Sequence, residues 1–247
     1  MSFHETIVLF NLIILHLFMG VRFVIFSFLL ICSNVLLFAQ NKQLNFSIQP
    51  QWNHQKLELE KGYVLDTGVI SISALKFYLS AFKLFRNNVV VYSDSIPAYL
   101  FDMENTTAIE LNIPKSVDYD ELAFQLGIDS ALTVSGNITG DLNPQKGMYW
   151  AWQSGYINFR IEGQVEHQNQ QKEGFDFHLG GYKYPYNSSQ LIKIKLNKVN
   201  QTNIGLKLDV ANLLAYFNLN ENKHLMSPGE KAVNFSKAIS KSFILIQ

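Results

Sequence analysis

Four histidines after residue 39 are the side chains best suited to bind a metal ion. They are His54, His167, His178 and His224, and Met226 follows the last of them by two residues. His167 stands in a polar run over residues 166–173, which predicts an exposed hairpin tip. His178 ends a strand-like segment, residues 175–179, just before a glycine pair that could present its ring at a rim.

An imidazole pair with few other ligands suits Cu(I), because this ion accepts two or three soft or borderline ligands. Zinc normally takes four ligands, usually including thiolate or carboxylate. A single histidine on a strand is more often an ordinary hydrogen-bonded residue, so that interpretation of His178 stays open. Four scattered histidines do not by themselves select a metal.

Tryptophans form the second group of candidate residues. Trp150 and Trp152 lie two apart and would share one face of an extended segment, as would Trp52 and His54. An aromatic ladder of this kind is usually core or a stacking platform. Carbohydrate stacking and an electron-accepting tryptophan near a metal are the alternatives.

The sequence offers no recognisable catalytic machinery. It has no Gly-x-Ser-x-Gly motif and no phosphate-binding glycine-rich loop, and the carboxylates of Asp118, Asp120 and Glu121 fit a solvated strand end. Lys plus Arg number 20 and Asp plus Glu number 20, so no net field attracts nucleic acid. We expect a binding protein and not an enzyme.

Residues 1–39 predict a secretory leader. A unit starting at Met19 has one basic residue, Arg22, then an apolar run and a small residue, Ala39, after which cleavage is expected. The competing interpretation, a pair of membrane spans, is disfavoured because polar residues divide the apolar run. The single cysteine, Cys32, lies inside the leader, so we expect a mature chain without disulfides, thiolate sites or a stable membrane span.

Residues 40–247 predict a single all-β domain, an antiparallel β-sandwich with Greek-key-like connections, a short helix and a C-terminal helix. Asp209 is expected to cap a helix over residues 211–217, and Ser227 to cap a helix over residues 231–243. Alternation of apolar and polar residues predicts the strands. They are residues 44–48, 56–60, 69–73, 75–84, 89–92, 107–113, 121–126, 155–163, 175–179, 191–199 and 204–210.

The stretch over residues 147–163, GMYWAWQSGYINFRIEG, resembles the MbnP-like copper-binding family, periplasmic proteins linked to methanobactin and copper handling with many relatives in Bacteroidetes. Further blocks resemble that family in the same order, at residues 75–84, 124–129, 140–144, 177–180 and 226–229. The resemblance implies an exported β-sandwich that binds copper, with Cu(I) as the expected form. It also implies a di-haem cytochrome c peroxidase-like partner that converts a tryptophan near the site to kynurenine.

The leading hypothesis is therefore an exported copper-binding protein, in the periplasm or at the cell surface. The Trp-x-His form of residues 52–54 and the Phe-His-Leu-Gly block make His54 and His178 the expected ligands and Trp52 the oxidisable ring. His224 and Met226 are reserve ligands. One alternative is that Trp150 and Trp152 dock the redox partner, and another is a metal-free module that binds glycan or protein through this aromatic face.

Overall fold

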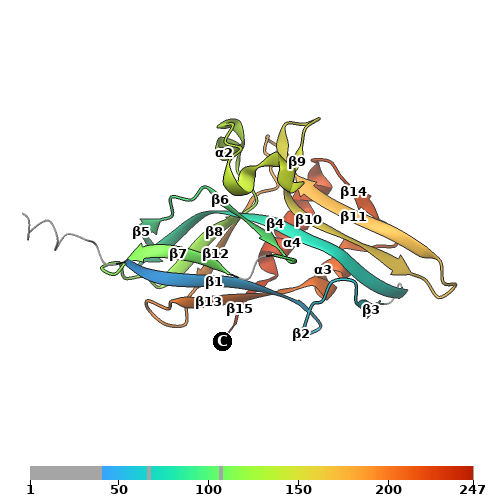
Figure 1. Ribbon diagram of the computed structural model, residues 1–247, viewed down its shortest axis with the longest axis horizontal. Coiled ribbons are helices and arrows are strands. Elements are labelled where there is room, and N and C mark those ends of the chain that lie inside the picture. Colours follow the sequence, from blue (N-terminus) through green and yellow to red (C-terminus); the bar gives the residue numbers. More distant parts are fainter. Residues whose placement is uncertain (1–40, 66–67, 106–107, 247) are drawn as a thin grey trace, which may run out of the picture. The chain divides into compact units, whose positions relative to one another are not determined.

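The structure is a computed structural model that describes residues 41–65, 68–105 and 108–246 (Figure 1). Its strands form two sheets.

The first sheet has five strands, and β1 is an interior strand of it. β1 pairs in parallel with β13, from Asn45 opposite Asn203 to Gln51 opposite Asp209. The strands are β1 (Asn41–Trp52), β2 (Gln55–Lys56), β7 (Ile109–Pro114), β13 (Asn203–Asp209) and β15 (Phe243–Leu245).

The second sheet has ten strands and is centred on β4 (Gly68–Arg86). Its main order is β12-β8-β4-β10-β11-β14, and its pairs are antiparallel except that β14 runs parallel to β11. The other strands are β3 (Gly62–Leu65), β5 (Val89–Ser93), β6 (Ala98–Asp102), β8 (Glu121–Leu126), β9 (Tyr149–Trp150), β10 (Gly155–Glu166), β11 (Lys172–Gly180), β12 (Gln190–Lys195) and β14 (His224–Leu225).

The main core lies between the two sheets. Phe46 of β1 packs edge-on against Phe82 and Phe124 of the other sheet, each with ring centroids 5.3 Å apart. Phe243 of β15 packs in the same way on Phe77, at 6.0 Å. The predicted β-sandwich is therefore confirmed, although the two parallel strand pairs make both sheets mixed.

Two helices follow β13, and the sequence located one of them more precisely than the other. α3 (Val210–Phe217) is capped as predicted by Asp209, whose side chain accepts from the backbone N–H of Asn212. α4 (Glu230–Lys241) begins after Gly229, so the predicted cap at Ser227 is wrong. The physical reason is tertiary packing. Pro228 packs beside Gly181, with its Cβ 3.0 Å from where a Cβ on Gly181 would stand, and this contact keeps the Ser-Pro-Gly segment outside the helix.

A helix that the sequence did not predict, α2 (Ser130–Val134), belongs to a small lobe, which we define as residues 129–154. The lobe also contains the short 3-10 helices η1 (Gly140–Leu142) and η2 (Pro144–Lys146), and it rises above the ten-stranded sheet in Figure 1. It covers part of the outer sheet face with a second apolar cluster. That cluster is Tyr78, Ala98, Leu100, Ile128, Leu142, Met148, Trp150, Tyr156 and Ile157.

The predicted leader, residues 1–39, lies outside the described residues. Lys42–Gln247 form one compact unit. A search of the described residues for a helix of membrane-crossing length and apolarity found none.

Candidate metal centre

The outer face of the β10–β11 hairpin carries a row of charged and imidazole side chains. The register sets Arg160 opposite His178 and Glu162 opposite Asp176. Residues two apart on a strand share a face, so these four side chains lie on one side. The intervening residues of β11, Phe175, Phe177 and Leu179, are buried in the main core on the other side.

His178 is the most constrained member of this row. It is 7% exposed, and its Nε2 lies 2.6 Å from Oε1 of Glu162. An ionised carboxylate only accepts hydrogen bonds, so in the neutral ring Nε2 carries the proton and Nδ1 keeps its lone pair. Nδ1 is buried and has no hydrogen-bond partner among the described residues.

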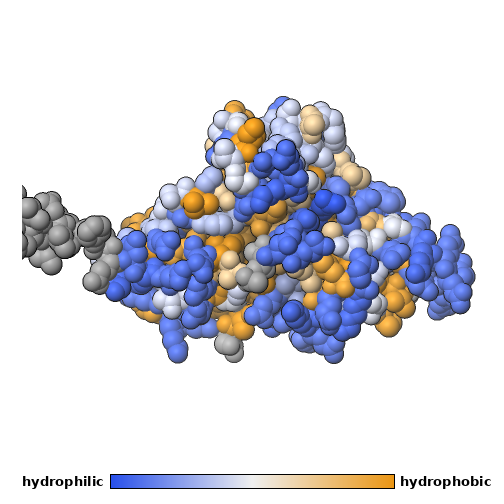
Figure 2. All heavy atoms as spheres, viewed as in Figure 1, coloured by the Kyte–Doolittle hydropathy of each residue, from blue (hydrophilic) through white to orange (hydrophobic). Residues whose placement is uncertain are grey.

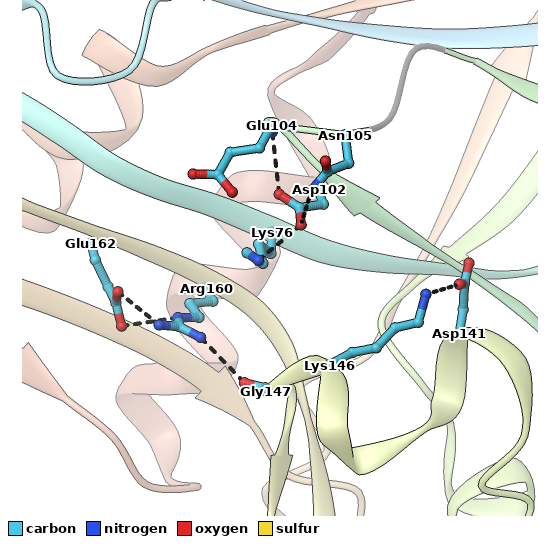
Figure 3. Close-up of polar contacts among 9 residues, drawn as sticks. All are labelled: Lys76, Asp102, Glu104, Asn105, Asp141, Lys146, Gly147, Arg160 and Glu162. Atoms are coloured by element: carbon cyan, nitrogen blue, oxygen red, sulfur yellow. Dashed lines mark hydrogen bonds and ion pairs between the residues drawn. The ribbon is translucent and has the colours of Figure 1, made fainter.

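The carboxylate of Glu162 is held in place by a bidentate contact with the guanidinium of Arg160. Nε of Arg160 donates to Oε1 at 2.9 Å and Nη2 donates to Oε2 at 2.8 Å, while Nη1 reaches the carbonyl of Gly147 in the lobe at 3.3 Å (Figure 3). Partial burial raises the pKa of Glu162, but hydrogen bonds from Arg160 and His178 outweigh it and leave that pKa below its ordinary value. Glu162 is therefore a charged, oriented acceptor for the His178 ring.

His224 forms a second histidine–carboxylate contact beside the first. β14 sets His224 opposite Asp176, and Nδ1 of His224 lies 3.0 Å from Oδ2 of Asp176. Asp176 is two residues before His178 on β11, and Met226 is two residues after His224. The structure therefore brings His178 and His224 to neighbouring strands at one sheet edge, and Met226 directly follows the second of these strands. Within the described ranges no three His, Cys, Asp or Glu side chains gather closely enough to hold a metal ion.

His54 and Trp52 lie in the other sheet. β1 ends at Trp52, and Asn53 and His54 form the turn to β2 with φ angles of 47° and 69°. The expectation that Trp52 and His54 share one face is wrong, because the chain reverses between them. Trp52 is buried and stacks on Tyr63 with centroids 4.7 Å apart, whereas His54 is exposed. The pairing of His54 with His178 remains an untested hypothesis from the sequence, and the proposal below uses the histidines of β11 and β14 in its place.

Trp150 lies over the same face of β11 as His178. Its ring atoms come within 2.5 Å of the position that a Cβ on Gly180 would occupy, so only glycine fits there. Its Nε1 is buried and has no partner among the described residues. Trp152 lies 5.6 Å from Trp150 and is 64% exposed, so the two rings are neighbours but only one belongs to the core.

Sequence reasoning missed the carboxylates that orient the histidines. Glu162 is 16 residues from its histidine and Asp176 is 48 from His224, so neither pair has a local motif. The available signal is the alternation Arg160-Ile161-Glu162, which puts two opposite charges on one face of the strand beside the buried Ile161. His167 was correctly predicted to lie at a polar hairpin end, which is hydrophilic in Figure 2.

Comparisons with known proteins identify one family. The MbnP family model matches residues 41–228. A solved structure, MbnP from Methylosinus trichosporium, matches with a TM-score of 0.52 and 11% sequence identity, over 71% of this chain and 78% of that chain. At this identity the likeness shows a shared fold. No similar sequence was found among curated proteins.

Proposed function

The chain belongs to the MbnP family, which is associated with methanobactin and copper handling, and from this premise we propose that it is an exported protein that binds Cu(I). In this proposal it is not an enzyme. His178 is the principal ligand, and His224 and Met226 at the same sheet edge complete the site.

The observation that carries the proposal is the buried, unpartnered Nδ1 of His178. Leaving a buried polar atom without a hydrogen bond costs about 1–3 kcal/mol, so such an atom needs an explanation. Metal-binding histidines commonly donate their other ring N–H to a carboxylate, which orients the ring and raises its basicity. The Glu162–His178 contact has this arrangement, and Nδ1 is the atom left to bind the ion.

His224 and Met226 supply the chemistry that Cu(I) prefers. The ion accepts imidazole and thioether at low coordination numbers, so it does not require the three-carboxylate or four-ligand groups typical of other metals. His178 and His224 lie on paired strands, which run about 4.7–4.9 Å apart, so their side chains start close together. The side chains of His224 and Met226 are 63% and 46% exposed, so both have room to turn toward His178.

The proposal also includes the oxidation of a tryptophan by a di-haem peroxidase-like partner. Trp150 is the ring best supported as the target near copper, because it covers Gly180, two residues from His178, and its Nε1 has no partner among the described residues. Peptide mass spectrometry after coexpression with such a partner should find kynurenine at Trp150. Kynurenine at Trp52 alone would instead support a site at His54.

Anaerobic titration of the purified protein with Cu(I), against a coloured competing chelator, tests the site. We expect one tightly bound ion and a loss of affinity of at least about 10-fold in His178→Ala. His224→Ala should also weaken binding. His54→Gly suits the positive φ of that turn, so it removes the imidazole without strain, and it should leave copper binding unchanged.

His167→Ala is the matched control, because His167 also contacts a carboxylate, that of Glu173, on the same hairpin. A wild-type protein that binds no Cu(I) would contradict the function. Unchanged Cu(I) binding in His178→Ala would contradict the assignment of the site but not the copper-binding function. Loss of binding in His54→Gly would support the pairing of His54 with His178 as the ligands.

A further inference from the structure

An open aromatic groove lies between the lobe and the chain that follows β11. Its volume is about 650 Å³. None of the proposed copper ligands lines it. The lining residues are Trp152, Gln153, Ser154, Gly181, Tyr182, Lys183, Tyr184, Tyr186 and Pro228.

The aromatic rings of this groove are unusually accessible. Trp152 is 64% exposed, Tyr184 is 96% exposed and Tyr186 is 47% exposed. Large aromatic side chains normally bury most of their area, so three exposed rings around one groove indicate a surface that is covered in the bound state.

The groove is held in shape before any ligand binds. Trp152 lies against Trp150, and the ring of Tyr182 lies 3.3 Å from where a Cβ on Gly155 would stand. Ser130 of α2 donates a hydrogen bond to the carbonyl of Tyr182, which ties the lobe to this segment. A preformed surface loses less entropy on binding, so weak stacking contacts can give measurable affinity.

Residues 181–188 form a loop that a backbone hydrogen bond closes. The backbone N–H of Ser188 donates to the carbonyl of Gly181 at 3.0 Å. Gly181 has a φ of 121°, and a Cβ there would come within 2.3 Å of the carbonyl oxygen of Tyr186. Only glycine allows this closure, and the closure places Tyr184 and Tyr186 at the groove.

The chemistry of the lining suits a sugar chain. The apolar ring faces can stack on the C–H faces of sugar rings, and the Tyr hydroxyls, Gln153 and Ser154 can exchange hydrogen bonds with sugar hydroxyls. Among the described lining residues Pro228 is the one aliphatic side chain, so the lining consists mainly of aromatic rings and hydrogen-bonding groups.

The charge along the groove indicates which class of sugar it would bind. Lys183 is the one charged residue among those described along the groove, and its Nζ lies 5.4 Å from the centroid of the Tyr182 ring. A cation beside stacking rings favours a sugar that carries a carboxylate. We propose that this groove binds an acidic oligosaccharide, with Trp152 and Tyr184 stacking on its rings and Lys183 pairing with a carboxylate.

Calorimetric titration with a hexamer of galacturonic acid tests the proposal, and its uncharged methyl ester is the matched control ligand. The acid should bind more tightly than the ester, and added salt should reduce the difference. Trp152→Ala and Tyr184→Ala should each weaken binding by about 10-fold, and Lys183→Gln should weaken binding of the acid alone by about 2- to 5-fold.

Tyr216→Ala is the control variant, because Tyr216 is 57% exposed on α3 and does not line the groove. His178→Ala should bind the hexamer as the wild type does, which separates this site from the copper proposal. Absence of binding, equal affinity for acid and ester, or unchanged binding in Trp152→Ala would each overturn the proposal.

Discussion

The hydrogen bonds of His178 determine which of its ring nitrogens can bind a metal ion. Glu162 accepts a hydrogen bond from the Nε2–H of His178, and the two hydrogen bonds from Arg160 keep Glu162 charged and fixed in orientation. The Nδ1 lone pair is therefore positioned by a contact on the opposite side of the ring.

Replacement of Glu162 tests this orienting role. Glu162→Gln keeps the side-chain size but removes the charge, so Cu(I) affinity should fall by about 10- to 100-fold while the stoichiometry stays at one. Glu166→Gln, on the same strand and paired with Lys172, is the control and should bind as the wild type does. Equal affinity in the two variants would contradict the role of Glu162.

The same carboxylate should make stability depend on pH. The pKa of Glu162 in the fold lies below its ordinary value of 4.5, so its charged contacts stabilise the fold above that pH and are lost as the pH falls through the lower, folded-state pKa. Urea unfolding at pH 7 should find the wild type more stable than Glu162→Gln, and the difference should shrink at pH 3. A difference that is the same at both values would contradict this expectation.

Among the secondary-structure elements, the alternation of apolar and polar residues located the long strands. The short strands form only because a neighbouring strand pairs with them. β4, β8, β10 and β13 were predicted because each has apolar residues at every second position over six residues or more. β9, β14 and β15 have two or three residues each, too few for a period, and exist because a neighbouring strand pairs with them. The edge that carries His224 was therefore beyond sequence reasoning.

The close packing of the β10–β11 hairpin predicts different stability effects for substitutions at two of its glycines. A Cβ on Gly163 of β10 would come within 2.1 Å of the carbonyl oxygen of Ser71, whereas on Gly174 of β11 its nearest contact would be an ordinary 3.8 Å. Gly163→Ala should therefore lower the free energy of unfolding by at least about 2 kcal/mol. Gly174→Ala should change it by less than about 1 kcal/mol. Chemical denaturation measures both, and equal effects would count against the packing described for β10.

Loss of the N-terminal cap of α3 should destabilise the fold less than the substitution at Gly163. Asp209→Ala removes the acceptor for the backbone N–H of Asn212 and should lower the free energy of unfolding by about 0.5–2 kcal/mol. Asp209→Asn keeps an acceptor and should restore most of the loss. Failure of Asn to do better than Ala would show that the cap contributes nothing measurable.

For the molecule as a whole, the sequence predicted the sandwich but not the full candidate site. Composition and alternation suffice for two packed sheets, because each needs only one apolar face. The candidate site depends on residues brought together from β10, β11 and β14, and that requires the register of the hairpin and the parallel return of β14. Individual ligands could be proposed, whereas their partners could not.

Export concerns the whole chain, including the leader that precedes the described residues. When the full chain is expressed with its leader in a Gram-negative host, the protein should be recovered from the periplasm with Gln40 as its first residue. Amino-terminal sequencing measures this directly. An amino terminus at Met1 or Met19 on a cytoplasmic product would contradict it.

The parallel pairing of β1 with β13 affects the order of folding. One side of β1 stays without its partner until residues 203–209 have been synthesised, more than 150 positions later. Contacts between such distant segments form slowly, because a long loop must close before they stabilise the fold. In the proposed export, a chain that crosses a narrow translocation channel must remain unfolded on the way, and the late arrival of β13 would keep the first sheet incomplete during that passage.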